Sequence, residues 1–140
     1  MTITEQKAAQ RKAGIAARRA LSDTERTRSN AALCARIMAL DCFKKAENIL
    51  LYAAFGGEAD LSALAVEAAR QGKTLAYPVC GEGFSLTAAV PGPDGWEVGA
   101  YGIRTPILSQ SEILRPDQLD LVLVPCTAFD TTCRLSLIHI

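Results

Sequence analysis

The stretch that decides the fold is Leu119-Asp120-Leu121-Val122-Leu123-Val124-Pro125-Cys126-Thr127-Ala128-Phe129-Asp130. Its apolar run, Leu121 to Val124, is short, rich in branched side chains and bounded by Asp120 and Pro125. Such a run predicts a strand that is buried on both faces. In open α/β sheets, ligands bind just beyond the carboxyl ends of such strands. We therefore expect the chemistry of this protein near Pro125 to Asp130.

A strand–helix–strand unit is predicted upstream of this stretch. Asn48 to Phe55, NILLYAAF, is an apolar strand, and Thr74 to Pro78 is a second one. Between them a helix is expected over Leu61–Arg70, with Asp60 as its N-cap and its end at Gly72. A right-handed crossover between two parallel strands is the strong default for such a unit.

The remaining segments complete an α/β prediction. Phe84 to Val90 is expected to be a strand antiparallel to its neighbour, Pro91 to Gly95 a loop, and Pro106 to Gln118 a mixed region with one helical turn before Pro116. A length of 140 residues fits one domain, 1–140, that buries a real core. We predict a three-layer α/β domain with a mixed, largely parallel sheet.

Two helices are expected before the first strand. Residues 4–20 are rich in Ala, Arg, Lys and Gln, with weak periodicity. Ser22 and Glu25 have the spacing of a capping box, which predicts the start of a second helix. The apolar side chains of that helix are expected to form one packing stripe, with Cys34 and Met38 close to it. The stripe consists of Leu33, Ile37 and Leu40.

The net charge of zero hides an uneven distribution. Residues 1–45 carry ten Lys or Arg against four Asp or Glu, a balance of +6, and residues 46–140 carry −6. A basic segment at one end favours an anionic partner such as a phosphate, a nucleotide or a nucleic acid. The alternative is a solvated helix face with surplus arginine, and the composition does not decide between them.

Several classes of protein are disfavoured by composition. No stretch approaches the roughly 20 apolar residues of a membrane span, and no signal-peptide core is found. The Arg-rich and Ala-rich N-terminus would also fit a transit peptide. Five cysteines without a C-x-x-C pair fit a reducing cytosol and argue against a zinc site. His139, the one histidine, leaves no histidine-based dyad or metal cluster in the body of the chain. We expect a cytoplasmic protein without a membrane anchor, and we expect no metal ligands from the chain.

Three features nominate binding residues. Lys7 and Arg11 are four residues apart, so they share a helix face and repel each other unless an anion lies between them. Glu58 follows a Gly-Gly turn at a strand end, where a carboxylate is a candidate ligand for a polar group or a cation. Trp96 and Tyr101 are placed to close over a ring-shaped ligand. Each has a plainer alternative: solvated cations, a solvated turn residue and aromatic anchors for a loop. No P-loop or G-x-G-x-x-G motif is present.

Taken in order, a set of short motifs resembles the 5-formyltetrahydrofolate cyclo-ligase (methenyltetrahydrofolate synthetase) family over about residues 5–130. The motifs are Lys7-x-x-x-Arg11, Arg19-Ala20-Leu21-Ser22, Glu25-Arg26, Ile49-Leu50-Leu51-Tyr52, Gly57-Glu58-Ala59-Asp60, Gly72-Lys73 before a strand that ends in Pro78, Tyr101-Gly102-Ile103-Arg104-Thr105-Pro106, Asp120-Leu121-Val122-Leu123-Val124-Pro125 and Ala128-Phe129-Asp130.

The resemblance implies an activity and roles for particular residues. Members of the family use ATP and Mg²⁺ to convert 5-formyltetrahydrofolate to 5,10-methenyltetrahydrofolate, with release of ADP and phosphate. Lys7 and Arg11 would bind the phosphates, because phosphoryl transfer depends on cations more than on a covalent nucleophile. Glu58 would hold the donor groups of the pterin, and Ala53 would let a ring lie on the backbone. The implied partners are ATP and the folate, with no nucleic acid, and the implied state is a monomer. No catalytic residue is assigned.

The sequence departs from the family after Asp130. The family continues into a glycine-rich loop whose backbone N–H groups approach the nucleotide phosphates. Here the chain runs Thr131-Thr132-Cys133-Arg134-Leu135 and then Ser136-Leu137-Ile138-His139-Ile140, without those glycines. Arg134 matches the ATP-binding arginine of the family, with a slip of one residue. Thr105 and Cys126 are milder departures, from Glu and Gly.

Two explanations account for this departure: a truncated protein, or a reading-frame error that makes residues 131–140 an aberrant tail. On either, the fold is expected to be incomplete at the C-terminus and Leu121–Val124 to have an unpaired edge. Three hypotheses follow. The chain is a folate cyclo-ligase with little activity by itself, or a non-catalytic α/β module that keeps the folate pocket around Glu58, or a nucleic-acid binder with a basic arm.

Overall fold

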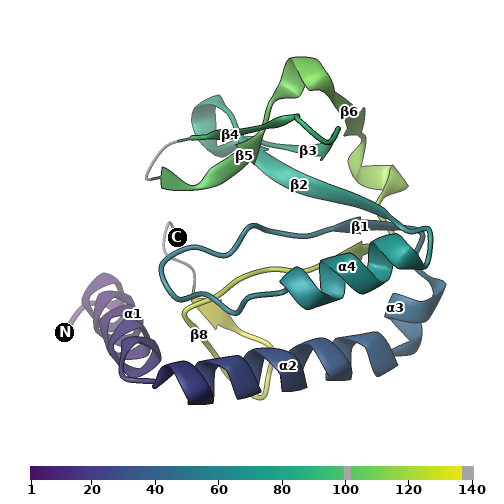
Figure 1. The fold of residues 1–140 in the computed structure, drawn as a ribbon. Helices are drawn as coiled ribbons and strands as arrows, with labels where there is room; N and C mark the ends of the chain where they lie inside the picture. The colour runs from purple at the N-terminus through teal and green to yellow at the C-terminus, as the bar shows by residue number, and fades with distance from the viewer. Residues whose placement is uncertain (100–101, 137–140) are drawn as a thin grey trace.

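The computed structural model of the protein describes residues 1–99 and 102–136 (Figure 1). Its centre is a five-stranded sheet in the order β6-β3-β2-β1-β7. The strands of this sheet are β1 Asn48–Leu50, β2 Thr74–Cys80, β3 Leu86–Pro91, β6 Ser111–Leu114 and β7 Leu121–Val122. The helices are α1 Ile3–Arg19, α2 Asp23–Ala39, α3 Asp41–Lys45 and α4 Ser62–Arg70. The described residues also form the hairpins β4 Trp96–Val98 with β5 Arg104–Pro106 and β8 Ala128–Phe129 with β9 Leu135–Ser136. Short 3₁₀ turns are found among them at η1 Glu82–Phe84, η3 Leu108–Gln110 and η4 Pro116–Gln118.

The sheet is mixed, and its centre is parallel. Strand β1 pairs in parallel with β2 on one side and with β7 on the other, whereas β3 runs antiparallel to both β2 and β6. The predicted unit of strand, helix and strand is present as β1, α4 and β2. The α/β class and the mixed sheet are therefore confirmed. Because the strands alternate their side chains, each face of this sheet has its own set of residues.

The core lies on one face of the sheet. Ile49 of β1 and Leu51 just after it pack with Cys34 of α2, Phe43 of α3 and Leu64 of α4. All three helices therefore cover the same face. Residues that point the other way line an open hollow of about 460 Å³ on the opposite face, among them Leu50, Pro78 and Leu114.

Strand β7 differs from its prediction. It occupies the edge of the sheet, and Val122 and Val124 are 47% and 50% exposed. The expectation of a strand buried on both faces was wrong. Val122 is in register with Leu50 and so points to the face opposite the helices, where only the alternate side chains Leu121 and Leu123 reach the core. An apolar run does not reveal whether both faces of its sheet are covered.

The two N-terminal helices form where they were predicted, and both begin with a capping box. Thr2 and Glu5 cap α1, and Ser22 and Glu25 cap α2. The packing stripe of α2 was wrong for Leu33 and Leu40, which are 38% and 52% exposed. The side chains that reach the core are Cys34, Ile37 and Met38.

Several element boundaries also differ. Ladder pairing from β1 ends with Leu51, whose N–H donates to the carbonyl of Ala76 (2.8 Å), so residues 52–55 leave the predicted strand. Helix α4 begins one residue later than expected, so Leu61 is its N-cap and the prediction of Asp60 as N-cap was wrong. The Asp60 carboxylate instead accepts a hydrogen bond from the Ser62 N–H (2.9 Å). Its end at Gly72, with φ +79°, was predicted correctly. The elements α3, β4, β5, β6, β8 and β9 were not predicted. No helix in the described part of the chain is long and apolar enough to cross a membrane.

Candidate active site

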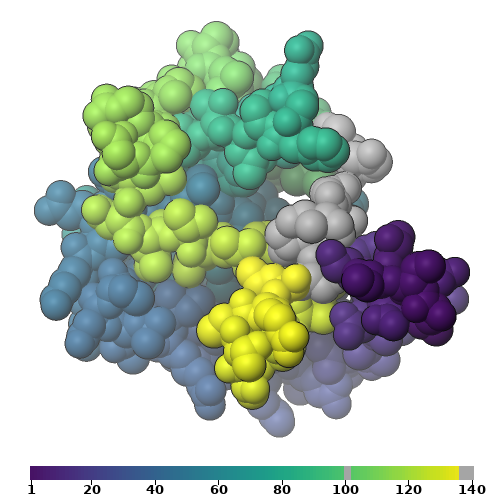
Figure 2. All heavy atoms as spheres, turned by 180° about the vertical axis from the view of Figure 1, so that it is seen from behind, coloured from purple at the N-terminus to yellow at the C-terminus, as the bar shows by residue number. Residues whose placement is uncertain are grey.

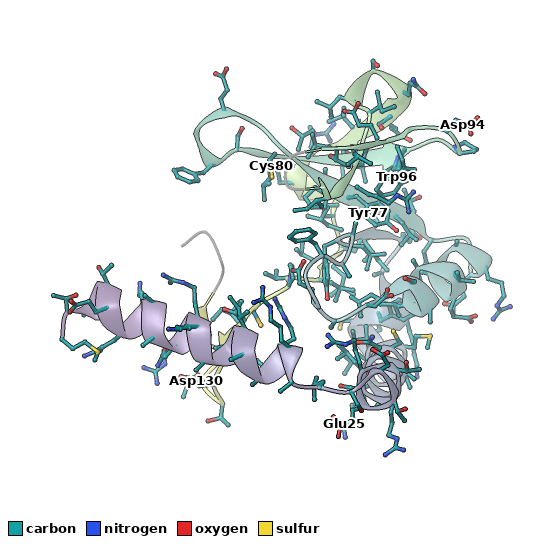
Figure 3. The ribbon with its side chains drawn as sticks, turned by 60° about the vertical axis from the view of Figure 1, so that its left-hand side comes forward. Glu25, Tyr77, Cys80, Asp94, Trp96 and Asp130 are labelled. Carbon is teal, nitrogen blue, oxygen red and sulfur yellow. The ribbon has the colours of Figure 1, made fainter. Side chains whose placement is uncertain are left out.

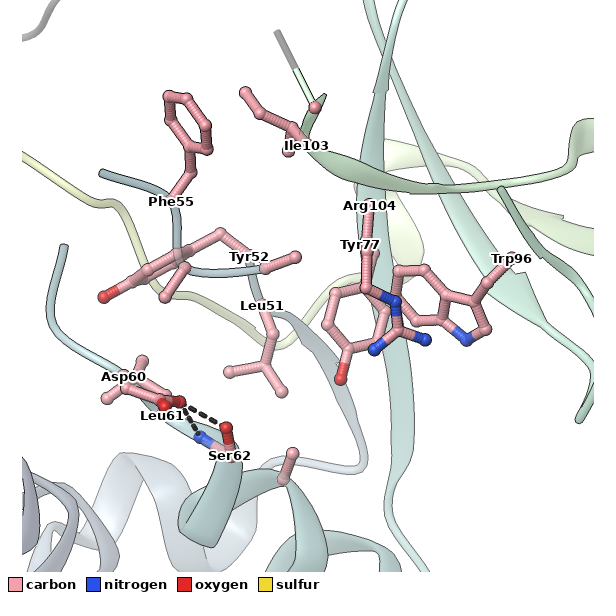
Figure 4. A pocket seen from close by; sticks show the side chains of 14 residues that line it. Leu51, Tyr52, Phe55, Asp60, Leu61, Ser62, Tyr77, Trp96, Ile103 and Arg104 are labelled. Atoms are coloured by element: carbon pink, nitrogen blue, oxygen red, sulfur yellow. Dashed lines mark hydrogen bonds between the residues drawn. The ribbon is translucent and has the colours of Figure 1, made fainter. Parts of the chain in front are cut away.

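A cavity of about 350 Å³ lies beyond the carboxyl end of β1 (Figure 4). Its walls come from the loop between β1 and α4, from the start of α4, from β2 and from the β4–β5 hairpin. This is the edge of a parallel sheet where ligands are expected in α/β folds. The sequence analysis predicted the site just after β7, which is the neighbour of β1 on the side away from β2. The lining residues are Leu51 to Phe55, Asp60 to Ser62, Ala65, Tyr77, Trp96 and Gly102 to Arg104.

One wall of the cavity is aromatic. The rings of Tyr77 and Trp96 meet edge to face, with centroids 4.7 Å apart and planes at 71°. The guanidinium carbon of Arg104 lies 4.7 Å from the centroid of the Trp96 ring. Burial raises the pKa of Tyr77, and the nearby Arg104 charge opposes that shift. The sequence nominated Trp96 as a ring-binding residue in a loop; the structure places it on β4, in the cavity wall. Tyr101, nominated with it, lies outside the described residues.

The opposite wall carries a carboxylate. Asp60 accepts hydrogen bonds from the N–H and the hydroxyl of Ser62, which lower its pKa, so it is ionised near neutral pH (Figure 4). Tyr52 lies beside it, and its hydroxyl donates to the carbonyl of Ala59 (2.8 Å). Burial, followed by the charge of Glu58, raises the pKa of Tyr52 to about 12. The cavity is therefore acidic at one end and has Arg104 at the other.

Only one of the two predicted substrate-binding residues lines the cavity. Ala53 lines the cavity directly. Glu58 belongs to the same loop and its charge helps to raise the pKa of Tyr52, but it is not among the lining residues. Its carboxylate accepts a hydrogen bond from the Phe55 N–H (3.0 Å) and closes a turn in which Gly56 and Gly57 have φ of +61° and +82°. This turn requires glycine, because other residues rarely adopt positive φ.

A basic helix face lies near this loop. In α1 the residues that are not fully exposed include Arg11, Gly14 and Arg18, whereas Lys7 is exposed. Gly14 lies against the backbone of Thr127, where any added Cβ would collide with the carbonyl oxygen. The face of α1 that carries Arg11 is thus turned toward the segment after β7. Lys7 and Arg11 share the predicted side of the helix, and the structure brings Arg11 nearer to the body of the protein.

Two arginines that were not singled out as site residues meet at the end of this helix. The guanidinium of Arg26 donates to the carbonyls of Arg18 (3.1 Å) and Gly57 (3.5 Å), which ties the α1–α2 junction to the glycine turn. The Nε of Arg18 is buried and has no hydrogen-bond partner in the described part of the chain. In the sequence these two arginines lie on either side of the capping box formed by Ser22 and Glu25. Nothing in their spacing indicated that Arg26 would reach Gly57.

Arg134 lies on the β8–β9 hairpin, which contacts α1. Figure 2 shows this hairpin in yellow next to the purple helix, and Figure 3 shows Asp130 beside α1 and far from Tyr77 and Trp96. The Arg134 Nε forms an ion pair with Asp130 (2.6 Å). Lys7, Arg11 and Arg134 are therefore gathered around one helix, whereas Ala53 lies at the cavity.

Among residues 1–99 and 102–136, no group of three His, Cys, Asp or Glu side chains is placed to hold a metal ion. Magnesium is commonly held by one or two carboxylates together with substrate phosphates rather than by a complete protein cage. All five cysteines are free.

The fold and the cavity define an α/β domain that presents a ligand site at the carboxyl edge of a parallel pair of strands and a basic helix near it. A model of the 5-formyltetrahydrofolate cyclo-ligase family matches residues 3–135. The chain belongs to this family, and the resemblance inferred from its motifs is confirmed.

Two solved structures are similar to this one. The NMR structure of Aquifex aeolicus 5,10-methenyltetrahydrofolate synthetase has a TM-score of 0.76 and 34% identity over 89% of this chain. The chain spans 62% of the length of that protein. A 5,10-methenyltetrahydrofolate synthetase from Mycoplasma pneumoniae has a TM-score of 0.74 over 94% of this chain and 71% of its own, and at 16% identity it supports the fold alone. A search of curated protein sequences found no match.

Proposed function

We propose that the protein is a 5-formyltetrahydrofolate cyclo-ligase, which uses ATP to form 5,10-methenyltetrahydrofolate, ADP and phosphate. The observation that carries this proposal is the family match over residues 3–135. The similar Aquifex protein is titled a 5,10-methenyltetrahydrofolate synthetase. The chain spans 62% of the length of that protein, so the ligase activity of the whole relative is carried to this chain as a proposal.

The reaction has two steps, and in each of them one bond forms and another breaks, with ADP leaving in the first and phosphate in the second. The γ-phosphoryl group of ATP is transferred to the formyl oxygen, which makes that oxygen a leaving group. N10 of the folate then attacks the formyl carbon and loses its proton, and the C–O bond breaks to release phosphate. Neither step requires a covalent nucleophile from the protein. Positioning and charge stabilisation are the main contributions expected of the residues.

The cavity suits the flat ring system of a folate. Ala53 has a side chain small enough for a ring to lie against the backbone, and Tyr77 and Trp96 offer aromatic surface on the other side. We propose that Glu58 accepts hydrogen bonds from the pterin. This role requires its carboxylate to keep one oxygen free, and only Oε1 is used by Phe55.

The nucleotide is assigned to the basic side of the molecule. We propose that Lys7 and Arg11 bind the phosphates, which would relieve the repulsion between their charges. Arg134 would join them only after exchanging its ion pair with Asp130 for a phosphate. Mg²⁺ would arrive with ATP and neutralise its phosphate oxygens, and we assign no residue of this chain to it.

A second candidate is a folate-binding module without catalysis. It is supported by the location of the cavity, which is lined entirely by residues between Leu51 and Arg104. The phosphate loop of the family would follow Asp130, where residues 131–136 contain no glycine. In this case the 140-residue chain binds folate but forms little product.

One experiment tests both candidates. The 140-residue chain is mixed with 5-formyltetrahydrofolate, ATP and Mg²⁺, methenyl formation is followed by absorbance, and folate binding is measured by calorimetry. Binding without turnover supports the folate-binding module. Turnover at ordinary enzyme rates shows that the chain is catalytic as it stands, and absence of folate binding contradicts both candidates. Glu58→Ala is expected to weaken folate binding about tenfold. Glu112→Ala, which alters an exposed carboxylate on β6, is the matched control.

We further propose that the chain is a single domain over residues 1–140, acts as a monomer, and has small molecules rather than nucleic acid as partners. We also propose a cytoplasmic location. The five free cysteines support a reducing compartment, because disulfides are rare there. Retention of folate binding at high salt would argue against the nucleic-acid alternative, whose affinity should fall steeply with salt.

A further inference from the structure

The cavity contains a cation whose role is not explained by the fold. Arg104 is exposed, lines the cavity and lies over the Trp96 ring at 4.7 Å. It forms no ion pair within residues 1–99 and 102–136. A surface arginine would ordinarily be mobile, but here the cation–π contact with Trp96 favours one position of the guanidinium (Figure 4). Its N–H edge is left for a ligand.

The fold fixes the position of this cation. Arg104 pairs with Val98 across the β4–β5 hairpin, and β5 packs on β2 beside Tyr77. The hairpin is held by a hydrogen bond from the Gly99 N–H to the Ile103 carbonyl (2.8 Å). Arg104 therefore sits on a paired strand rather than on a free loop, and side chains on such elements are placed more precisely.

The two ends of the cavity carry opposite charges. The ionised Asp60 and the nearby Glu58 are at the end formed by the β1–α4 loop, and Arg104 is at the hairpin end. A folate is complementary to this arrangement. Its pterin, rich in hydrogen-bond donors, suits the acidic end, and its glutamate carboxylates suit the end that carries Arg104. The ring system between them matches the aromatic wall of Tyr77 and Trp96.

We propose that Arg104, held in place by Trp96, binds a glutamate carboxylate of the folate substrate. The proposal rests on the proposed function, and it assigns an orientation: pterin toward Glu58 and Asp60, glutamate toward the β4–β5 hairpin. A planar guanidinium donates two parallel hydrogen bonds to a carboxylate, which an ammonium cannot do. Arg104 would thus determine whether the site prefers folates that carry a glutamate tail.

The test compares two ligands. Calorimetry gives the affinity of the 140-residue chain for 5-formyltetrahydrofolate and for the carboxamide of 5-formyltetrahydropteroate, which has the same rings but neither a glutamate nor any other carboxylate. Arg104→Met is expected to weaken binding of the first ligand about tenfold and to leave the second unchanged. Arg104→Lys keeps the charge without the planar fork and should fall between wild type and Arg104→Met. Arg115→Met removes an exposed arginine beside the hollow on the other face of the sheet and should change neither affinity.

The outcomes distinguish failure of the Arg104 assignment from failure of the proposed function. If both ligands bind and Arg104→Met weakens them equally, or weakens neither, the carboxylate assignment is overturned while the proposed function stands. If wild type binds neither ligand, the proposed function is contradicted and this assignment with it. A preference of wild type for the glutamate-bearing ligand that disappears in Arg104→Met supports the assignment.

Discussion

The carboxylate of Asp120 accepts a hydrogen bond from the backbone N–H of Asn48 at 2.9 Å, across 72 residues of sequence. The same Oδ2 atom also accepts from the Glu47 N–H at 2.9 Å. In return the Asn48 side chain donates to the carbonyl of Gln118 (2.9 Å), and the Asp120 N–H donates to the Asn48 carbonyl (2.9 Å). Strand β7 is therefore fixed to β1 at its start, before any ligand-binding segment begins.

Asp120→Asn should lower stability, because the amide replaces a charged acceptor with a neutral one. The hydrogen bonds from Asn48 and then Glu47 lower the pKa of Asp120 in the folded state. Its contribution to stability is present above the unfolded pKa of about 3.9 and is lost as the pH falls through the folded pKa. Urea unfolding at several pH values should show the largest difference between variant and wild type near pH 7 and a smaller one at acid pH. Asp117→Asn, an exposed carboxylate of η4, is the control; equal effects of the two substitutions would contradict the role of Asp120.

Gly14→Ala should loosen the docking of α1. Replacing a glycine inside a helix by alanine ordinarily stabilises it by about 0.5–1 kcal/mol. Here the new methyl group would meet the Thr127 carbonyl oxygen, and overpacking costs about 1–3 kcal/mol. Amide hydrogen exchange should become faster in α1 and in the segment around Thr127 but not in β2.

Ala17→Gly is the control for this substitution, because it changes helix propensity at an exposed position of the same helix. It should speed exchange within α1 without affecting the segment around Thr127. Slower exchange of α1 in Gly14→Ala than in wild type would show that the helix does not lie against Thr127.

Arg11→Met should weaken ATP binding about tenfold, and Lys7→Met by less, since Lys7 is exposed while Arg11 is partly buried on the side of the helix that faces the protein. Nucleotide affinity is measured by calorimetry at two salt concentrations, and a lower salt dependence is expected in each variant. Lys12→Met provides an exposed cation on another face of α1 and should have little effect. If Lys12→Met matches Arg11→Met, the loss reflects net charge alone.

Tyr52→Phe should change the alkaline limb of the stability profile. The pKa of Tyr52 is raised to about 12 by burial and then by the charge of Glu58. A raised pKa contributes stability that is complete below the unfolded value of about 10 and is lost as the pH rises through the folded value. Wild type should lose stability between pH 10 and pH 12 more steeply than the variant.

At neutral pH Tyr52→Phe should destabilise the fold by about 1 kcal/mol, because the Ala59 carbonyl loses its donor. Chemical unfolding at each pH, with tyrosinate absorbance as a second signal, measures both effects. Parallel alkaline limbs for the two proteins would show that Tyr52 is not buried as described.

Local signals in the sequence predicted local structure well. The Ser22–Glu25 capping box and Gly72 fixed the start of α2 and the end of α4, because caps depend on a few neighbouring residues. The packing of α2 was less predictable. Leu33 and Cys34 are adjacent, and only the position of α4 and the sheet decides that Cys34 is buried while Leu33 is exposed.

The site was predicted only in part. Ala53 and Trp96 do line the cavity, but its wall combines Tyr77 of β2 with Trp96 and Arg104 of a hairpin. This combination depends on the packing of the hairpin against β2, which no spacing reveals. The hairpin itself was taken for a loop, because its strands are three residues each. Glu58 shows the opposite case: its place at the strand end was predicted, while its bond to the Phe55 N–H depends on the turn.

Trp96 is the single tryptophan of the chain, and it belongs to a hairpin that joins the sheet mainly through β2. Its intrinsic fluorescence therefore reports on the cavity wall, whereas the far-ultraviolet circular dichroism signal comes mainly from the helices. If the hairpin detaches before the sheet unfolds, the two signals will give different midpoints in denaturant. The protein thus has a built-in optical probe of whether its ligand cavity opens independently of its core.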